Sequence, residues 1–438
     1  MLRLIIIKKS RLTIIFFVFI FGISFLLTLL LREPRVKLGE NYIYCNPRAK
    51  INLKKHYQIN LWDYKWPISE TSISYSEYLK RAIRGFQKLY PNVEVKFQLL
   101  DFLSGPAELD QALKSNNAPD IYCSAFRIPS FNFARQIPVG FYLSKADCSI
   151  YLPNAINNSK YQGTLCYFPR WIAPGFWIGN QSLVESAGLS ITKIQNNGWS
   201  WQDLKETGKL IGKDKYLLVG NLGINGLLPQ LMANSGKDFT LSKVDDIKKL
   251  NLSIDFMDQL VQAHLIPPDC DQKMYERFLR GQVMFLGGIR PASNRMIYKR
   301  LRNCRADWQP VLLPIPTRVP GEKTLITEDS VIAIYRNKRT NGDDHLAVAV
   351  KLGQFLSCYP EITPWENLMV CPANKALFYQ WIQNQGPNRN LYNGLPKWDR
   401  FHNLRPLPVE PFKLYSVVND FVAQKISAAE VKIQLSQK

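Results

Sequence analysis

Histidine is scarce in this chain, and the motifs that mark common enzyme sites are missing. Only four histidines occur in 438 residues, and the chain contains no G-x-S-x-G, P-loop or H-E-x-x-H pattern. The cysteines form no C-x-x-C pair, so we predict no metal site and no cofactor. We therefore predict a binding protein and not an enzyme. A glycosidase is a minor alternative, because sequence cannot identify two facing carboxylates.

Acidic residues are few relative to basic ones. Lys and Arg number 56 while Asp and Glu number 35, which gives a formal net charge of +21. Such a charge can indicate nucleic acid, an anionic membrane surface or an anionic ligand as the partner. The basic residues are scattered, and no zinc-finger spacing, RNP-like run or long basic helix occurs. We predict no nucleic-acid binding, and a basic surface that lies near a membrane.

Long apolar runs are absent except at one place. Leu12–Leu31 is a run of 20 residues without a charge, long enough to cross a bilayer as a helix. Lys8, Lys9 and Arg11 before it outweigh Arg32 behind it, so the N-terminus is expected in the cytoplasm and the rest outside. A cleaved signal peptide is the alternative, but its apolar region is usually shorter and ends at small residues. We predict a single-pass anchor in the cell membrane.

Eight cysteines lie in the predicted extracytoplasmic part, where disulfides can form. Their spacing does not determine their pairing. Cys148 with Cys166 and Cys358 with Cys371 are candidate pairs, and buried free thiols are an equal alternative.

The first part of the exported chain alternates strands and helices. Residues 32–54 are polar and basic and are expected to form a tether, so the folded part should begin at Tyr57. The order β-α-β-α-β follows from five segments: YQINLW, Tyr75–Tyr90, VEVKFQLL, Leu109–Ser115 and APDIYCSAF. This order predicts an α/β fold with a mostly parallel sheet covered by helices.

The stretch Tyr161–Leu189 is unusually rich in aromatic residues. Pro169 and Pro174 keep its middle out of a helix. Ser182 with Glu185 three residues later predicts a capped helix after it. One interpretation is a buried strand pair. The other is a strand that crosses between two lobes and presents aromatic side chains to a ligand.

Seven segments follow one another in a recognisable order and spacing. They are YPNVEVKF, NNAPDIYCSAF, YQGTLCYFPRW, NQSLVESAGL, WSWQDLKETGKLI, FLRGQVMFLGG and LLPIPTRVPGEKTL. Each is weak alone, but together they resemble the extracellular solute-binding proteins (family 1) of bacterial ABC importers. The resemblance extends from about residue 57 to the C-terminus. It is greatest to the branch that binds maltose-like sugars and other oligosaccharides.

This resemblance implies a two-lobe, periplasmic-binding-protein-like α/β fold of type II, preceded here by one transmembrane helix. We expect an anchor and tether at 1–54, one lobe at 55–165 with 290–338, and another at 166–289 with 339–438. A cleft between the lobes would close on a carbohydrate for delivery to an ABC permease, and the protein would be a monomer. The alternative is a membrane-tethered sensor or partner-binding module of the same fold with an altered or lost ligand.

Candidate ligand-binding residues are aromatic or polar side chains, because sugars offer apolar faces to rings and hydroxyls to charged groups. Several follow strands whose carboxyl ends line the crevice in open α/β sheets. The candidates are Trp62, Asp63, Tyr64, Lys65, Ser124, Arg127, Arg170, Trp171, Arg290, Asp329, Trp365 and Glu366. For these side chains a structural role, in the core or in a surface loop, is the alternative.

At several positions this chain lacks an acidic or aromatic residue that many family members carry, and two of these positions hold arginine. Ala173 replaces a common Glu in the crossover, Arg127 stands where many members carry an acid, and Arg290 follows the glycine pair where many have Trp. Arg binds carboxylates through two parallel hydrogen bonds. Together with Arg170, these changes suggest a preference for acidic saccharides. The alternative is a neutral cleft in which the arginines pair with acids of the protein, namely Asp63, Asp329 or Glu366.

Overall fold

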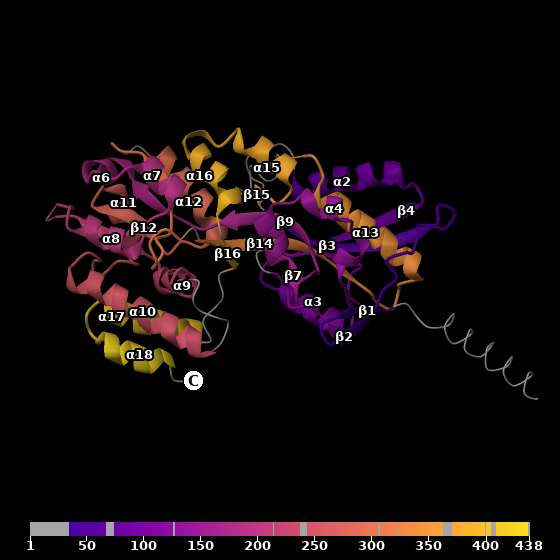
Figure 1. The fold of residues 1–438 in the computed structure, drawn as a ribbon, viewed down its shortest axis with the longest axis horizontal. Helices are drawn as coiled ribbons and strands as arrows, with labels where there is room; N and C mark the ends of the chain where they lie inside the picture. Colours follow the sequence, from indigo (N-terminus) through magenta and orange to yellow (C-terminus); the bar gives the residue numbers. More distant parts are fainter. Residues whose placement is uncertain are drawn as a thin grey trace, which may run out of the picture.

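The computed structural model describes residues 35–66, 74–125, 128–212, 214–236, 243–304, 307–322, 324–361, 370–398, 400–403 and 409–436. Two sheets, each covered by helices, organise this part of the chain (Figure 1). The predicted α/β class is therefore confirmed.

The larger sheet has eight strands and forms one body of the molecule. Its main path runs through β15 (Cys371–Pro372), β9 (Phe168–Pro174), β14 (Thr324–Tyr335), β5 (Ile121–Cys123), β3 (Tyr57–Tyr64) and β4 (Val93–Leu100). Two more strands also pair with β14, namely β6 (Gln136–Ile137) and β16 (Arg400–Asn403). β3 pairs in parallel with β4 and β5, as the predicted β-α-β-α-β order requires. The long strand β14 runs antiparallel to β5 and β9 and makes the sheet mixed.

Helices predicted from periodicity pack on this sheet. α2 (Tyr75–Leu89) buries Tyr78, Ala82 and Phe86 and is capped by the Ser74 side chain. α3 (Gly105–Lys114) begins earlier than predicted, with a proline in its first turn, a position that a helix tolerates. The other elements of this body are η1 (Val139–Tyr142), α4 (Lys145–Ser149), α5 (Pro153–Asn158), the hairpin β7 (Lys160–Tyr161) with β8 (Thr164–Leu165), and α13 (Asp343–Ser357).

The smaller sheet has four strands, in the order β11 (Tyr216–Gly220), β12 (Val283–Gly287), β10 (Phe176–Asn180) and β13 (Pro310–Pro314). β11 and β12 are parallel, whereas β10 is antiparallel to both of its neighbours. Around it lie α6 (Gln181–Ser186), α7 (Ile191–Asn197), α8 (Trp201–Gly208), α9 (Leu227–Ala233), α10 (Lys243–Gln262), α11 (Met274–Leu279) and α12 (Pro291–Asn303).

C-terminal helices complete the arrangement. α18 (Ala428–Ser436) packs against both α10 and α17 (Pro411–Val422), and the three helices lie below the smaller sheet in the view of Figure 1. Nearer the middle of the molecule lie α15 (Lys375–Ile382), η2 (Gly386–Asn388), α16 (Arg389–Gly394) and η3 (Leu395–Lys397).

The aromatic stretch crosses between the two sheets. β9 belongs to the larger sheet, β10 belongs to the smaller one, and only Gly175 separates them. Every residue of both strands is buried, but each strand pairs with other strands of its own sheet and not with the other. The predicted cap of the following helix is wrong. Helix α6 begins at Gln181, and the side chain of Asn180 accepts the Leu183 N–H at 3.2 Å.

The sheet to which a segment belongs differs in two places from the lobe predicted for it, but this does not define the lobe boundaries. β13 lies in the smaller sheet, although 290–338 was assigned to the first lobe. Helix α13 packs on β14 and β9 of the larger sheet, although 339–438 was assigned to the second. The lobe boundaries given above remain a prediction.

The expected tether at residues 35–54 is wrong, because this segment is folded. β1 (Arg35–Leu38) and β2 (Asn41–Tyr44) form a hairpin. Leu38 and Ile43 are buried against the rest of the protein, as is Cys45 after the hairpin. The basic composition concealed a short apolar alternation, which is enough to attach a two-stranded ribbon to a larger core.

The predicted anchor, Leu12–Leu31, lies outside the described residues. Within the part of the chain that the structure describes, no helix has the length and apolar character needed to cross a membrane.

None of the eight cysteines, which all lie among the described residues, forms a disulfide, so neither candidate pair is present. Burial raises the pKa of Cys45 and Cys166 to about 12, which keeps both thiols protonated and unreactive at neutral pH.

Candidate functional site

Two of the predicted ligand contacts form a buried ion pair with each other. Asp63 lies near the end of β3, and Arg170 lies in β9. Their side chains meet as a fork, with Nη1 to Oδ1 at 3.0 Å and Nη2 to Oδ2 at 2.7 Å. Asp63 is 0% exposed and Arg170 is 4% exposed. Burial alone lowers the pKa of Arg170, but the Asp63 carboxylate and nearby Tyr75 reverse this, and the net pKa is raised well above its usual value.

The remaining acceptor capacity of this carboxylate is used by its neighbours. Tyr75 Oη donates to Oδ2 at 2.6 Å, Trp66 Nε1 donates to Oδ1 at 3.3 Å, and the Tyr64 N–H donates to Oδ1 at 2.8 Å. A buried charge is stable only when it is paired and hydrogen-bonded in this way. The arrangement therefore supports a structural role for Asp63 and Arg170, in which they hold β3 and β9 together.

Trp171, the aromatic residue predicted to stack on a sugar, has no exposed surface. Its ring meets Trp66 edge-on, with centroids 5.2 Å apart and an interplanar angle of 79°. Trp66 in turn packs on Phe102 with centroids 5.0 Å apart. Such T-shaped contacts are the preferred geometry of aromatic pairs in cores. The ring of Trp171 is therefore part of the hydrophobic core of the protein.

The other predicted residues of the larger sheet are placed as follows. Tyr64 is buried and its hydroxyl lies 2.7 Å from the hydroxyl of Tyr122, whereas Trp62 is half-buried and Lys65 is exposed. Ser124 is buried, and its Oγ accepts the Val331 N–H at 2.9 Å. Asp329 is buried in β14 and accepts a hydrogen bond from Asn158 Nδ2 at 2.6 Å. Arg127, Trp365 and Glu366 lie outside the described residues.

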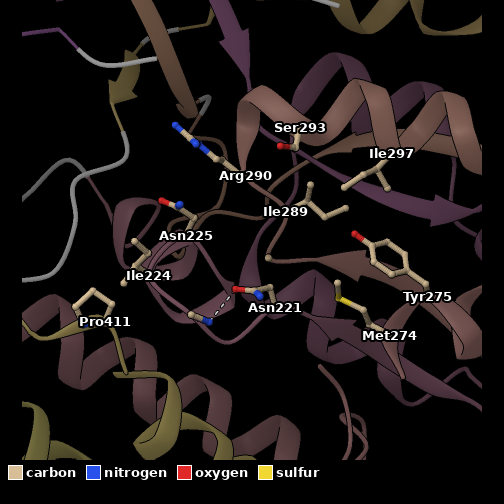
Figure 2. A pocket seen from close by; sticks show the side chains of 12 residues that line it. Asn221, Ile224, Asn225, Met274, Tyr275, Ile289, Arg290, Ser293, Ile297 and Pro411 are labelled. Carbon is tan, nitrogen blue, oxygen red and sulfur yellow. Dashed lines mark hydrogen bonds between the residues drawn. The ribbon is translucent and has the colours of Figure 1, made fainter. Parts of the chain in front are cut away.

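A pocket of about 430 Å³ lies at the smaller sheet (Figure 2). It forms where the parallel strands β11 and β12 end and where helix α12 begins. Its polar lining comes from Asn221, Asn225, Tyr275, Arg290 and Ser293, and its apolar lining from Ile224, Met274, Ile289, Ile297 and Pro411. Crevices at the carboxyl ends of strands are the usual ligand sites of open α/β sheets.

The glycine pair after β12 allows the backbone to approach closely here. Gly288 has a φ of +62°, which residues with a side chain rarely adopt. A Cβ on Gly288 would lie 2.5 Å from the backbone oxygen of Asn221, inside any normal contact. The floor of the pocket therefore requires glycine at this position.

Arg290 is the predicted residue that lines this pocket. Its Nε donates to Glu328 Oε1 at 2.6 Å, and Glu328 lies in β14 of the larger sheet. The Arg290 side chain is 43% exposed and the Glu328 side chain only 9%. The ion pair therefore connects the pocket on the smaller sheet with the larger sheet, which places the pocket beside the junction of the two bodies.

Most residues of the pocket carry no motif that predicts them from the sequence. Asn221 directly follows β11, and this strand was not predicted. Tyr275 lies in α11 and no motif marked it. The position after the strand YLLVG was the available signal for Asn221. Among the described residues, no group of three or more His, Cys, Asp or Glu side chains is arranged to hold a metal ion.

Comparison with known proteins agrees with this architecture. Residues 70–266 match the family described as bacterial extracellular solute-binding protein. The sugar-binding protein MalE from Xanthomonas citri has 16% identity and a TM-score of 0.66, over 87% of this chain and 95% of that one. The ABC substrate-binding protein Lmo0181 from Listeria monocytogenes, in complex with cycloalternan, has 15% identity and a TM-score of 0.56. This match covers 87% of this chain and 97% of that one. No curated protein matches the chain.

A further solved structure leads to the same conclusion. A family 1 extracellular solute-binding protein from Bifidobacterium longum subsp. infantis has 14% identity and a TM-score of 0.63, over 87% of this chain and 98% of that one. At such identities the likeness shows the fold, which is the predicted two-lobe α/β fold. The match over residues 70–266 and the shared fold confirm that the chain resembles the family 1 extracellular solute-binding proteins of bacteria.

Proposed function

We propose that the protein captures an oligosaccharide outside the cytoplasm and passes it to an ABC permease. The observation that carries this proposal is the pocket at the carboxyl ends of β11 and β12. Tyr275 is 39% exposed, and its ring can stack on a sugar face, while the amides of Asn221 and Asn225 can bind hydroxyls. The similar proteins described as binding sugars or cycloalternan support the same class of ligand.

The charge of the ligand is a separate part of the proposal. The predicted preference for an acidic saccharide required arginines that are not already paired with acids of the protein. In the structure Arg170 forms an ion pair with Asp63, and Arg290 forms one with Glu328. The positive charges of these two arginines are thus balanced by acids of the protein itself, while Arg127 lies outside the described residues. We propose a neutral oligosaccharide as the ligand, with an acidic one as the competing outcome.

Membrane attachment is also part of the proposal. Leu12–Leu31 is long and apolar enough to keep the protein in the cell membrane, with the binding domain outside. Sequencing the N-terminus of the mature protein tests this. A start beyond Leu31 would contradict the anchor and leave the binding proposal untouched.

Titration calorimetry of the full-length protein tests ligand binding, with cycloalternan, maltodextrins and matched uronate oligosaccharides as probes. We expect binding of a neutral member and a loss of about tenfold or more in affinity for Tyr275→Ala, since aromatic contacts contribute about 0.5–1.5 kcal/mol beyond area burial. Tyr379→Ala is the matched control, because Tyr379 is an exposed tyrosine on α15, away from the pocket lining.

The outcomes separate the alternatives. Tighter binding of the uronates would restore the acidic preference. Binding of no saccharide at all would overturn the proposal and favour the sensor or partner-binding alternative. An equal loss of saccharide affinity in Tyr275→Ala and Tyr379→Ala would indicate that the ligand binds away from this pocket.

A further inference from the structure

The hairpin at the start of the described chain has two chemically different faces. Directly opposed residues of an antiparallel pair share one face, and the faces alternate along each strand. In the observed register Arg35 lies opposite Tyr44 and Lys37 opposite Tyr42, while Val36 lies opposite Ile43 and Leu38 opposite Asn41. One face therefore combines two cations with two tyrosines, and the other is mostly apolar.

The apolar face attaches the hairpin to the protein. Leu38 is 1% exposed and Ile43 is 3% exposed. The turn at Gly39 lies so close to Gln162, in the β7–β8 turn, that a Cβ on Gly39 would overlap the Gln162 amide. Since Cys45 directly after the hairpin is also fully buried, the ribbon is fixed on the larger-sheet body and not suspended from it.

The opposite face is open to solvent. Tyr42 is 64% exposed and Tyr44 is 36% exposed, and Arg35 and Lys37 are exposed beside them. The guanidinium of Arg35 lies over the ring of Tyr44, 4.2 Å from its centroid. Tyrosines flanked by Lys and Arg are typical of side chains at a membrane–water interface, where the ring sits among headgroups and the cation meets phosphate.

The segment after the hairpin extends this chemistry. Arg48, Lys50 and Lys54 are exposed, and Leu53 between them is 66% exposed. Residues 35–54 thus contain five exposed basic residues and one exposed acidic residue, Glu40. Clusters of basic residues on the cytoplasmic side of a membrane helix bind anionic lipids, and the same attraction acts wherever a leaflet carries anionic headgroups.

The place of the hairpin in the chain limits how far it can lie from a bilayer. Only three residues separate Leu31, the end of the apolar run, from Arg35. Four steps of chain span at most about 15 Å, comparable to the headgroup layer of about 5–8 Å plus one Debye length of about 8 Å. Basic side chains held at this distance would therefore feel the potential of the lipid surface.

From these observations we infer that the β1–β2 hairpin docks the binding domain on anionic lipid headgroups through Arg35, Lys37, Tyr42 and the basic residues that follow. This inference rests on the membrane anchoring proposed above. The hairpin leads to the amino end of β3, whereas the pocket lies at the carboxyl ends of β11 and β12 in the other sheet. Figure 1 shows the hairpin at the lower edge of the larger-sheet body, away from β12, so docking would leave the pocket accessible.

Hydrogen exchange of the full-length protein in lipid nanodiscs tests the inference. One preparation contains phosphatidylcholine alone, and the other includes about 30% phosphatidylglycerol to supply the anionic surface. We expect slower exchange in peptides covering residues 35–54 with the anionic lipid, and reversal of this protection at about 1 M salt, where the Debye length falls to about 3 Å.

Charge reversal identifies the residues responsible. Arg35→Glu with Lys37→Glu should abolish the protection, because each basic residue near such a surface changes binding about fivefold. The matched control is Lys193→Glu with Lys248→Glu, which changes net charge equally at exposed lysines of α7 and α10. Saccharide binding should be unchanged in both double variants.

Each outcome decides the proposal. Equal exchange of residues 35–54 in the two lipids, or equal effects of the two charge reversals, would overturn it. Protection with phosphatidylcholine alone that survives salt would show burial against protein or lipid tails and would also overturn it. Failure of the full-length chain to integrate into nanodiscs would overturn the anchor and the docking together, whereas loss of saccharide binding alone would concern only the proposed function.

Discussion

Arg290 and Glu328 join the two sheets across 2.6 Å, from the pocket at the end of β12 to the middle of β14. The carboxylate is largely buried, and the guanidinium is partly in solvent. A contact of this kind both shapes the pocket wall and fixes the position of one body relative to the other. It is the point at which ligand binding and the arrangement of the two bodies are expected to be coupled.

Arg290→Met is expected to weaken saccharide binding about tenfold and to lower the free energy of unfolding by about 1 kcal/mol. The stability loss is modest because the side chain is 43% exposed and its ion pair is partly screened. Calorimetry and urea denaturation measure the two effects. Lys193→Met, at an exposed lysine of α7, is the control. Unchanged affinity in Arg290→Met would remove Arg290 from the binding site.

Arg170→Met is expected to lower the free energy of unfolding by about 3–5 kcal/mol, because it leaves the fully buried Asp63 carboxylate without its cation. Adding Asp63→Asn in the same chain should recover part of this loss, since the uncompensated charge is then gone. Chemical denaturation of the two single variants and the double variant measures the coupling. Additive losses would show that the ion pair contributes nothing beyond its separate residues.

Trp171→Ala is expected to destabilise the protein by about 3–5 kcal/mol, the usual cost of removing a large aromatic side chain from a core. Trp171→Phe should retain much of the stability, because the T-shaped contact with Trp66 can persist. Thermal unfolding and saccharide titration of both variants distinguish a core role from a ligand contact. If Trp171→Ala keeps its melting temperature but loses its ligand, the residue stacks on the sugar, as the sequence suggested.

Low pH is expected to lower the free energy of unfolding, in part because Asp120 becomes protonated. This residue is fully buried in the larger-sheet body. Burial raises the pKa of this carboxyl, but hydrogen bonds from His345, the Asn60 N–H and Asn337 outweigh burial, and the net pKa is lowered from 3.8. A lowered folded-state pKa gives stability that is present above the unfolded-state pKa and is lost as pH falls through the folded-state value.

Asp120→Asn should therefore lower the free energy of unfolding at neutral pH and flatten its fall below about pH 4. Urea denaturation at a series of pH values down to about 3 gives the pH dependence of the free energy of unfolding for the wild type and for Asp120→Asn. Glu185→Gln, at an exposed residue of α6, serves as the control carboxylate. Parallel curves for the wild type and Asp120→Asn would assign the acid sensitivity to other groups.

Local sequence patterns determined the elements of this protein well. The alternation in Tyr57–Tyr64 and Val93–Leu100 and the apolar side of Tyr75–Leu89 were sufficient to predict two strands and a helix in the right order. Ser200 and Asp203, three residues apart, likewise form a capping box at the start of α8. These features depend on neighbours within a few residues, which the sequence displays directly. The order of the segments also carried the resemblance to the solute-binding family.

Only the tertiary structure decided which polar side chains were available to a ligand. Asp63 and Arg170 are 107 positions apart, and nothing local indicates that one neutralises the other inside the core. Asn221 and Tyr275 reach one pocket because β11 and β12 pair in parallel and end at the same edge. The hairpin at 35–44 was hidden in a basic segment because the burial of Leu38 and Ile43 and the approach of its turn to Gln162 exist only in the folded protein. Charge, burial and pairing of this kind are properties of contacts between remote segments, and composition and periodicity do not specify those contacts.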